Sequence, residues 1–99
     1  MSLPSATEAS KALKHPLRRQ LIPIFAANEP LSPREAAQLV REPLTLVSYH
    51  VKELVKLKFL VLSSREQVRG VLKNYYVLNE NVLDLPKVQR LIVRQNLSS

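Results

Sequence analysis

The side chains best suited to chemistry lie between Pro43 and Leu57, where hydroxyl, aromatic and ammonium groups share one side of an expected helix. That side is opposite Val47 and Val51, which recur with the spacing of a buried stripe. A hydroxyl there can pair with the edge of a nucleic-acid base, and a ring or methyl group can contact a thymine methyl. An ordinary solvated helix face would show the same pattern. The candidates for base or backbone contact are Thr45, Ser48, Tyr49 and Lys52.

A second group of candidates surrounds Gly70, the only glycine of the chain. Arg65, Arg69 and Lys73 flank it, at what the residue pattern predicts to be the tip of a β-hairpin. Long cationic side chains at such a tip can contact backbone phosphates or a narrow minor groove. The alternative is that these charges are only solvated.

Two neighbouring arginines, Arg18 and Arg19, form the third group. They can neutralise phosphates of a nucleic-acid backbone. One of them could instead form an ion pair with Glu35, with Glu53 or with another helix. The sequence leaves both interpretations open.

Other chemistries have little support in the residue types. His50 is interpreted as a packed or hydrogen-bonded helix residue, and His15 is the only other histidine, so a zinc site would need carboxylates from elsewhere. Ser48 and His50 are two residues apart and point to different helix faces, which excludes a nucleophile and base pair. A chain with no cysteine and one glycine has no thiolate chemistry and no glycine-rich phosphate loop. We therefore expect no metal, no cofactor and no enzyme activity.

The composition favours a polyanionic partner. Lys and Arg number 15 against 8 acidic residues, a formal charge of +7, and such an excess suits nucleic acid or an anionic membrane surface. The longest apolar stretches, such as 59–62, are far shorter than the roughly 20 residues that span a bilayer. The N-terminal residues have neither a basic start nor an apolar stretch typical of a secretory signal. We expect one domain over residues 1–99, located in the cytoplasm and away from membranes.

Three helices are expected in the first part of the chain. A capping-box spacing begins the first, over 6–14, and a proline in the first turn begins the second, over 16–27. Pro23 has no N–H to donate, so we expect a kink or an early break there. Ser32 begins a third helix over 33–40, again with a capping box.

The second part predicts a helix followed by a hairpin. After a short interruption a longer helix covers 43–57, so that two helices joined by a turn make a helix-turn-helix. Residues 59–65 and 71–78 are rich in Val, Leu and Tyr and predict a hairpin, or wing. A final helix covers about 85–96. The expected fold is mostly α with a small β-hairpin wing, a winged helix-turn-helix, with its core at about 12–80.

Three segments resemble the ArsR/SmtB-like family of winged helix-turn-helix transcriptional regulators. They read ALKHPLRRQLI at Ala12–Ile22, VSYHVKELVKLKFL at Val47–Leu60 and NYYVLNE at Asn74–Glu80, in the order of that family. The resemblance implies a dimer that binds double-stranded DNA, with one recognition helix per subunit in the major groove. It also implies that each wing lies over the flanking backbone or minor groove.

The chain also departs from that family. Pro43 and Leu44 replace the polar residues that commonly open the recognition helix, so base contacts would begin at Thr45. Lys58 replaces the glycine that commonly ends it, which requires either a left-handed conformation or another kind of stop. The paired cysteines of the family's metal-sensing motif are absent, because the matching segment reads PREAAQLV.

A homodimer is expected because the final helix carries an apolar stripe that a domain of this size covers only in part. The first helix offers apolar residues beside it. The candidate interface residues are Leu13, Val88, Leu91 and Ile92.

Two other functions stay open. Leu44 and Leu46 favour a winged helix used as a protein-interaction module without specific DNA binding. Binding to RNA or to single strands is disfavoured, because the chain has few aromatic residues for base stacking.

Overall fold

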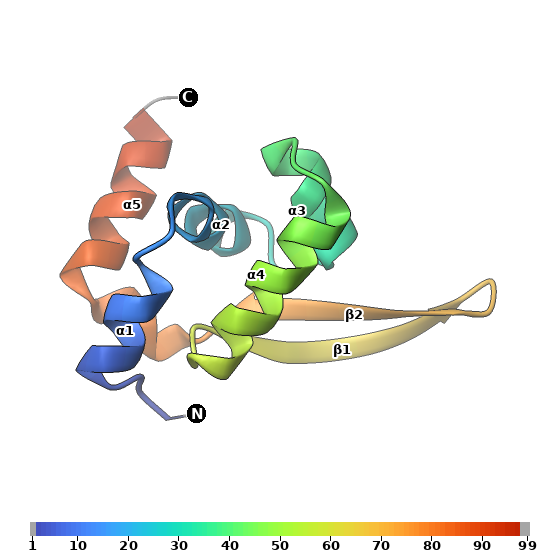
Figure 1. Cartoon of the computed structure of the whole chain (residues 1–99), viewed down its shortest axis with the longest axis horizontal. Helices are drawn as coiled ribbons and strands as arrows, with labels where there is room; N and C mark the ends of the chain where they lie inside the picture. Colours follow the sequence, from blue (N-terminus) through green and yellow to red (C-terminus); the bar gives the residue numbers. More distant parts are fainter. Residues whose placement is uncertain (1, 98–99) are drawn as a thin grey trace.

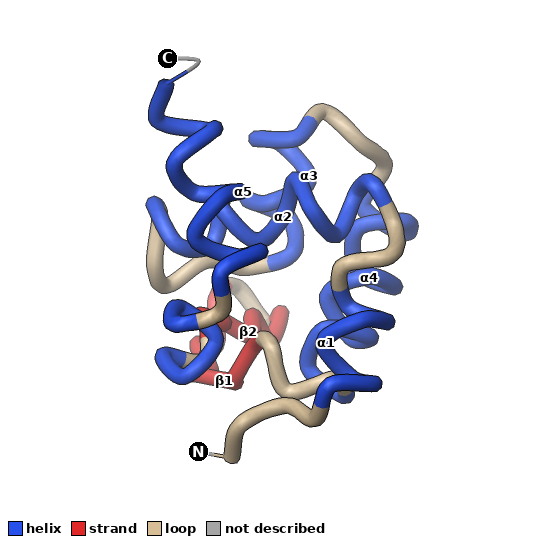
Figure 2. Tube along the Cα trace, turned by 90° about the vertical axis from the view of Figure 1, so that its left-hand side faces the viewer, coloured by secondary structure: helices blue, strands red, loops and turns tan. Residues whose placement is uncertain are grey.

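The computed structural model describes residues 2–97 and the side chains of residues 2–94. Over this range the chain forms helices packed together and a two-stranded antiparallel sheet that projects from them (Figure 1). In the turned view of Figure 2 the strands are seen nearly end-on, so the hairpin points away from the helices. In chain order the elements are α1 (Ala6–Ala12), α2 (Pro16–Ala27), α3 (Pro33–Val40), α4 (Leu44–Lys56), β1 (Leu60–Val68), β2 (Val71–Leu78), the 3-10 helix η1 (Glu80–Asp84) and α5 (Pro86–Leu97).

Capping boxes begin α1 and α3, as the spacing predicts. In α3, the Glu35 N–H donates to Ser32 Oγ at 3.2 Å and the Ser32 N–H donates to Glu35 Oε1 at 3.0 Å. The same pair of bonds joins Ser5 and Glu8 at α1. Each box satisfies two backbone donors that the first turn of a helix leaves without partners, so both helices begin where predicted.

The first helix ends two residues before the predicted Lys14. The cause lies at the junction with α2, where His15 must be extended because Pro16 follows it. His15 then caps α2, since its Nδ1 accepts a hydrogen bond from the Leu17 N–H at 3.1 Å. The chain therefore leaves α1 at Ala12 to reach this extended residue.

Of the two outcomes expected at Pro23, a kink or an early break, the early break does not occur. Helix α2 continues through Pro23 to Ala27. Proline in a helix interior costs about 3 kcal/mol because it removes one backbone hydrogen bond and crowds the preceding turn. Pro23 is itself buried, beside the fully buried Ile22 and close to Phe25, and this burial offsets the missing bond.

The end of α4 has a left-handed residue where glycine is usual. The Phe59 N–H donates to the Leu54 carbonyl at 2.9 Å and the Lys58 N–H donates to the Val55 carbonyl at 3.1 Å. This is the Schellman pattern, and it places Lys58 at φ 66°. Of the two alternatives that the sequence left open for Lys58, the structure has the left-handed one.

We expect Lys58→Gly to raise the free energy of unfolding by about 1 kcal/mol, because a side chain at positive φ is strained and glycine is not. Urea unfolding followed by circular dichroism measures the change. Lys58→Ala is the matched control, since it removes the ammonium group 3.6 Å from Glu8 Oε1 but keeps the strain. Equal stability of the glycine and alanine variants would contradict this explanation.

The wing is an antiparallel ladder with one bulge, between Leu62 and Ser64, and it is closed by a two-residue turn. Arg69 and Gly70 connect the strands at φ 50° and 78°, the two positive values of a type I′ turn. Val68 pairs with Val71 next to the turn, and Leu60 pairs with Leu78 at the root. The first strand extends to Val68 instead of the predicted Arg65, because the tight turn keeps the ladder paired to its end.

Two polar contacts and a short β-bridge fix the root of the wing. Leu31 and Tyr76 exchange backbone hydrogen bonds of 3.0 and 2.9 Å, and the Leu78 N–H donates to Glu29 Oε1 at 2.9 Å. The buried Asn79 donates from Nδ2 to the carbonyls of Ser2 and Lys58. The hairpin is therefore tied both to the α2–α3 connection and to the end of α4.

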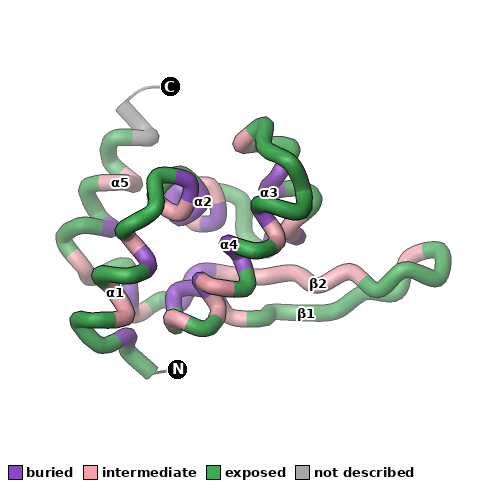
Figure 3. The backbone as a smooth tube through the Cα atoms, in the orientation of Figure 1, coloured by how far each residue is buried: buried purple, intermediate pink, exposed green. Residues whose placement is uncertain are grey.

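The core lies between the helices and the root of the wing, and most of the wing is exposed or half-buried (Figure 3). Within the described residues, no helix is long and apolar enough to cross a membrane. The fully buried large side chains include Leu21, Ile22, Phe25, Val47, Val51, Leu54, Phe59 and Val82.

Candidate nucleic-acid interface

Helix α4 presents a polar face that the other described residues leave uncovered. Its inner side carries Val47, Val51 and Leu54, which are at most 1% exposed. On the other side Tyr49 is 55% exposed, and Thr45 and Lys52 are also exposed. The predicted division of this helix into a buried and a solvent-facing side is therefore confirmed.

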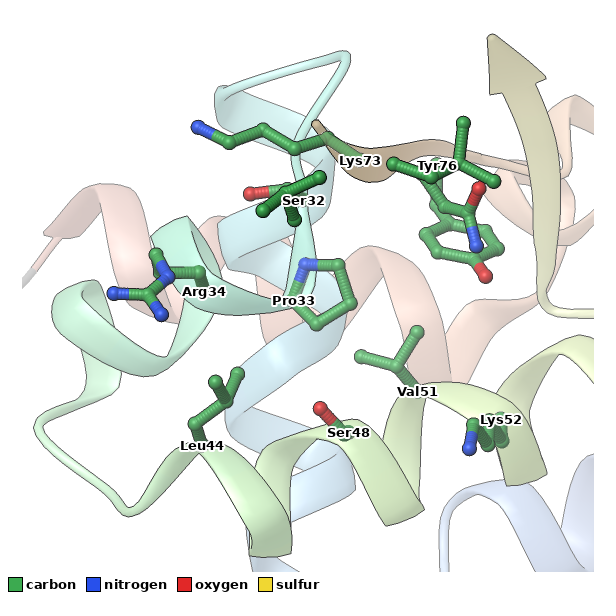
Figure 4. Close-up of a pocket in the computed structure, with 12 residues that line it drawn as sticks. Ser32, Pro33, Arg34, Leu44, Ser48, Val51, Lys52, Lys73 and Tyr76 are labelled. Carbon is green, nitrogen blue, oxygen red and sulfur yellow. The ribbon is translucent and has the colours of Figure 1, made fainter. Parts of the chain in front are cut away.

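Ser48 lies at the edge of that face, half-buried in a groove between α4, the start of α3 and strand β2 (Figure 4). The groove has a volume of about 320 Å³. Ser48 and Pro33 face each other across it, and Val51 projects from α4 on the same side as Ser48. The residues that line it are Ser32, Pro33, Arg34, Leu44, Ser48, Val51, Lys52, Val71, Leu72, Lys73, Asn74 and Tyr76.

Sequence reasoning missed several polar members of this groove, among them Ser32, which it gave only as a helix cap. Arg34 is exposed in the first turn of α3, and Asn74 and Tyr76 are half-buried on β2. Asn74 Oδ1 is buried without a hydrogen-bond partner among the described residues. The strand pairing would have identified Asn74 and Tyr76, because alternate residues of a strand share a face. That pairing depends on the bulge between Leu62 and Ser64, which the residue pattern does not show.

The three cations of the wing lie at different places. Arg69 occupies the turn, and Arg65 pairs with Asn74, so the structure places Arg65 on the strand face that borders the groove. Lys73 pairs with Glu66, and its ammonium group extends away from the centre of the groove (Figure 4). All three have no ion pair with any residue in 2–97. Their contact with phosphates stays a prediction.

Arg18 and Arg19 hold the end of α1. Arg18 donates to His50 Nδ1 at 3.1 Å and to the Lys11 carbonyl at 2.9 Å. Arg19 Nη1 donates to the carbonyls of Leu13 and Lys14 at 2.7 and 2.9 Å. Neither arginine forms an ion pair within the described part of the chain, so the expected alternative of pairing with an acidic helix residue is not found.

His50 is packed and hydrogen-bonded, as expected. It is 3% exposed, and its ring centroid is 4.2 Å from that of His15 and 5.1 Å from that of Tyr49, whose ring plane is inclined to it by 74°. Burial lowers the pKa of His50, and the neighbouring His15 and Arg18 lower it further, against the carboxylate of Glu53. Within residues 2–97, no group of three or more His, Asp or Glu side chains could hold a metal ion.

This environment predicts acid sensitivity. Because the pKa of His50 is lower in the folded chain than in the unfolded one, the unfolded chain binds more protons below the ordinary pKa of about 6.5. The free energy of unfolding should hold above that pH and fall as the pH drops through the folded-state pKa. Urea unfolding between pH 5 and 8 measures it. His50→Gln should flatten this part of the profile, and an unchanged slope would contradict the assignment.

The structure corrects one residue of the expected dimer interface. Val88 is fully buried in the core of its own chain, so it has no surface to offer a second copy. The reason is that α5 packs against α2 and uses this side of its stripe within the monomer. Leu13, Leu91 and Ile92 are half-buried and keep part of their surface.

No family model and no curated protein matches the sequence. Solved structures do match. The homodimeric winged helix-turn-helix DNA-binding domain of a possible ArsR-family transcriptional regulator from Mycobacterium bovis is similar, with TM-score 0.64 and 17% identity over 99% of this chain and 89% of that one. The transcriptional regulator SlyA is similar with TM-score 0.55 and 14% identity, over 94% of this chain and 66% of that one. The predicted fold is thus confirmed: the chain is a winged helix-turn-helix.

Proposed function

We propose that this chain is a sequence-specific double-stranded-DNA-binding transcriptional regulator of the ArsR-like type. The observation that carries the proposal is the uncovered face of α4, where Thr45, Tyr49 and Lys52 stand exposed beside the wing. An α-helix with such a face fits the major groove, and a hairpin next to it reaches the flanking backbone. The formal charge of +7 supports a polyanionic partner.

The proposal extends to the rest of the molecule. We place the chain in the cytoplasm as one domain that binds neither metal nor cofactor and catalyses no reaction. Support comes from the similar structures, which are described as a DNA-binding domain and as a transcriptional regulator.

We also propose a homodimer through α1 and α5, which leaves Leu13, Leu91 and Ile92 as interface candidates. One of the similar structures is described as homodimeric. Two recognition helices in such a dimer would lie about 34 to 36 Å apart, one turn of DNA. Selected binding sites should then be inverted repeats.

The first test is competition among nucleic acids. Purified protein should select a duplex from a random pool and prefer it over scrambled duplex, single strands and RNA. We expect Arg69→Asn to weaken selected and scrambled duplexes by similar factors and to reduce the salt slope by about one for each phosphate that the variant no longer neutralises. Asparagine keeps the wing intact, because Asn-Gly is a preferred type I′ turn. Absence of any duplex preference in the wild type would contradict the proposal.

A protein-interaction module is the second candidate. Leu44 and Leu46 are 38% and 39% exposed at the start of α4, and Leu72 of the wing is 55% exposed. Apolar surface suits a protein partner better than a polar DNA groove. The test compares the wild type with Leu46→Asp at low salt. The protein-interaction function takes precedence if the variant keeps its fold and neither the wild type nor the variant binds any duplex.

A further inference from the structure

A second basic site lies on the side of the molecule away from the wing, where Figure 1 shows α1 and α5. The end of α1, the start of α2 and the outer side of α5 enclose an open groove of about 640 Å³. Its apolar part is formed by Leu13 and Leu91. Its cationic residues are Lys14, Arg19, Lys87, Arg90 and Arg94, and Ser10 completes the lining.

The described lining gives the groove positive charge only. Among the described residues that line it, none is acidic. Lys14, Arg19, Lys87 and Arg90 have no ion pair with any residue in 2–97, where the salt bridges are Lys56 with Glu53 and Lys58 with Glu8. Like charges gathered in a concave surface raise its potential and attract counter-ions.

Two of the guanidinium groups are held in position by the backbone. Arg19 Nη1 is bonded to two carbonyls, at 2.7 and 2.9 Å, and Arg90 Nε lies 3.4 Å from the Pro86 carbonyl. A guanidinium has five N–H donors, so these bonds leave donors on both side chains. A positioned guanidinium is the group best suited to the oxygens of phosphate, which it can bind in pairs.

We propose that this groove binds a small multivalent anion of the phosphate class. A single carboxylate would neutralise only one of the cationic side chains, whereas a pyrophosphate-like anion carries several charges on closely spaced oxygens. The anion contacts Arg19 and Arg90, and Lys14 and Lys87 add charge around it.

The site also has a consequence for assembly, which rests on the proposed homodimer. Leu13 and Leu91 are candidate interface residues and lie inside the groove. Two copies that pair over this face bring two sets of cations together, and like charges at an interface oppose association. The anion removes this repulsion, so its binding favours the dimer by linkage.

Titration calorimetry of the full chain with pyrophosphate, in chloride buffer at constant ionic strength, tests the site directly. We expect the double variant Lys87→Gln/Arg90→Gln to bind pyrophosphate at least tenfold more weakly than the wild type. The matched control is Lys11→Gln/Arg41→Gln, which removes two exposed cations outside the groove and should bind as the wild type does. Equal losses in both variants would mean an adventitious ion only and would overturn the proposal, as would no binding by the wild type.

Sedimentation of the same proteins separates this proposal from the proposed dimer. Pyrophosphate should tighten wild-type dimerisation at least tenfold. The groove variant, Lys87→Gln/Arg90→Gln, should dimerise in the absence of pyrophosphate. A chain that binds pyrophosphate but stays a monomer would refute the dimer and support the site.

A final arm measures binding to duplex DNA. If the groove variant binds duplex as the wild type does, the anion is a free one; if its duplex affinity falls, the phosphates are those of the DNA backbone.

Discussion

Tyr49→Ala should weaken binding to the selected duplex by about 1 to 3 kcal/mol, roughly 5- to 150-fold, while scrambled duplex is bound almost as before. The reason is the position of the ring. Tyr49 is 55% exposed on the open face of α4, in the N-terminal half of the helix, which is the part that meets base edges in helix-turn-helix complexes. In the proposed complex the ring contacts a matching base only on the preferred sequence, so only that sequence should be bound more weakly by the variant.

The measurement is a fluorescence titration of both duplexes over a range of salt concentrations. Ser48→Ala should also weaken binding to the selected duplex alone. Tyr49→Phe should lose only the part of the binding free energy that depends on the hydroxyl group. The salt slope should not change, because neither side chain is a cation. If Tyr49→Ala weakens both duplexes equally, the proposed base contact is wrong and the protein-interaction function becomes the better explanation.

Phe59→Ala should lower the free energy of unfolding by about 3 to 5 kcal/mol, a large part of the total stability of a small domain. Phe59 is completely buried at the junction of α4 and β1. Its backbone N–H donates to the Leu54 carbonyl, and its carbonyl accepts from the Asn79 N–H, both at 2.9 Å. The side chain therefore fills the core at the point where α4 meets the wing.

Urea unfolding gives the size of this effect, and duplex binding at low temperature shows whether the remaining folded protein still functions. Leu62→Ala is the matched control, since Leu62 lies close by in the adjoining strand β1 but is 38% exposed, and it should cost less than about 1 kcal/mol. Similar losses in the two variants would mean that Phe59 is not the anchor we describe.

The elements with local signals were predictable from the sequence. A capping box and a proline in the first turn predict the start of α3 at Pro33. The predicted helix, Pro33–Val40, has the same bounds in the structure. The turn between Val68 and Val71 was also located correctly by the single glycine. In these places the conformation is decided by residues next to one another in the chain.

The errors occur where distant parts of the chain decide. Local rules predict a kink or an early break at Pro23, and the break does not occur, because burial in the core keeps α2 continuous. Val88 lies on an apolar stripe, and a stripe does not show whether its own chain or a second copy will cover it. Helical spacing was enough to find the open face of α4, whereas Arg34 and Asn74 reach the groove only through packing between elements.

The length of the wing has a further consequence, for solubility. The described sheet has only two strands, so β1 pairs with β2 on one side and leaves the backbone donors and acceptors of its other edge, from Leu60 to Val68, without a neighbouring strand. Such an edge can recruit strands from other molecules and begin aggregation. The middle of β1 reads SSREQ, and its charged and polar side chains oppose that pairing. Arg65 and Glu66 thus keep the strand edge soluble, whatever the wing binds.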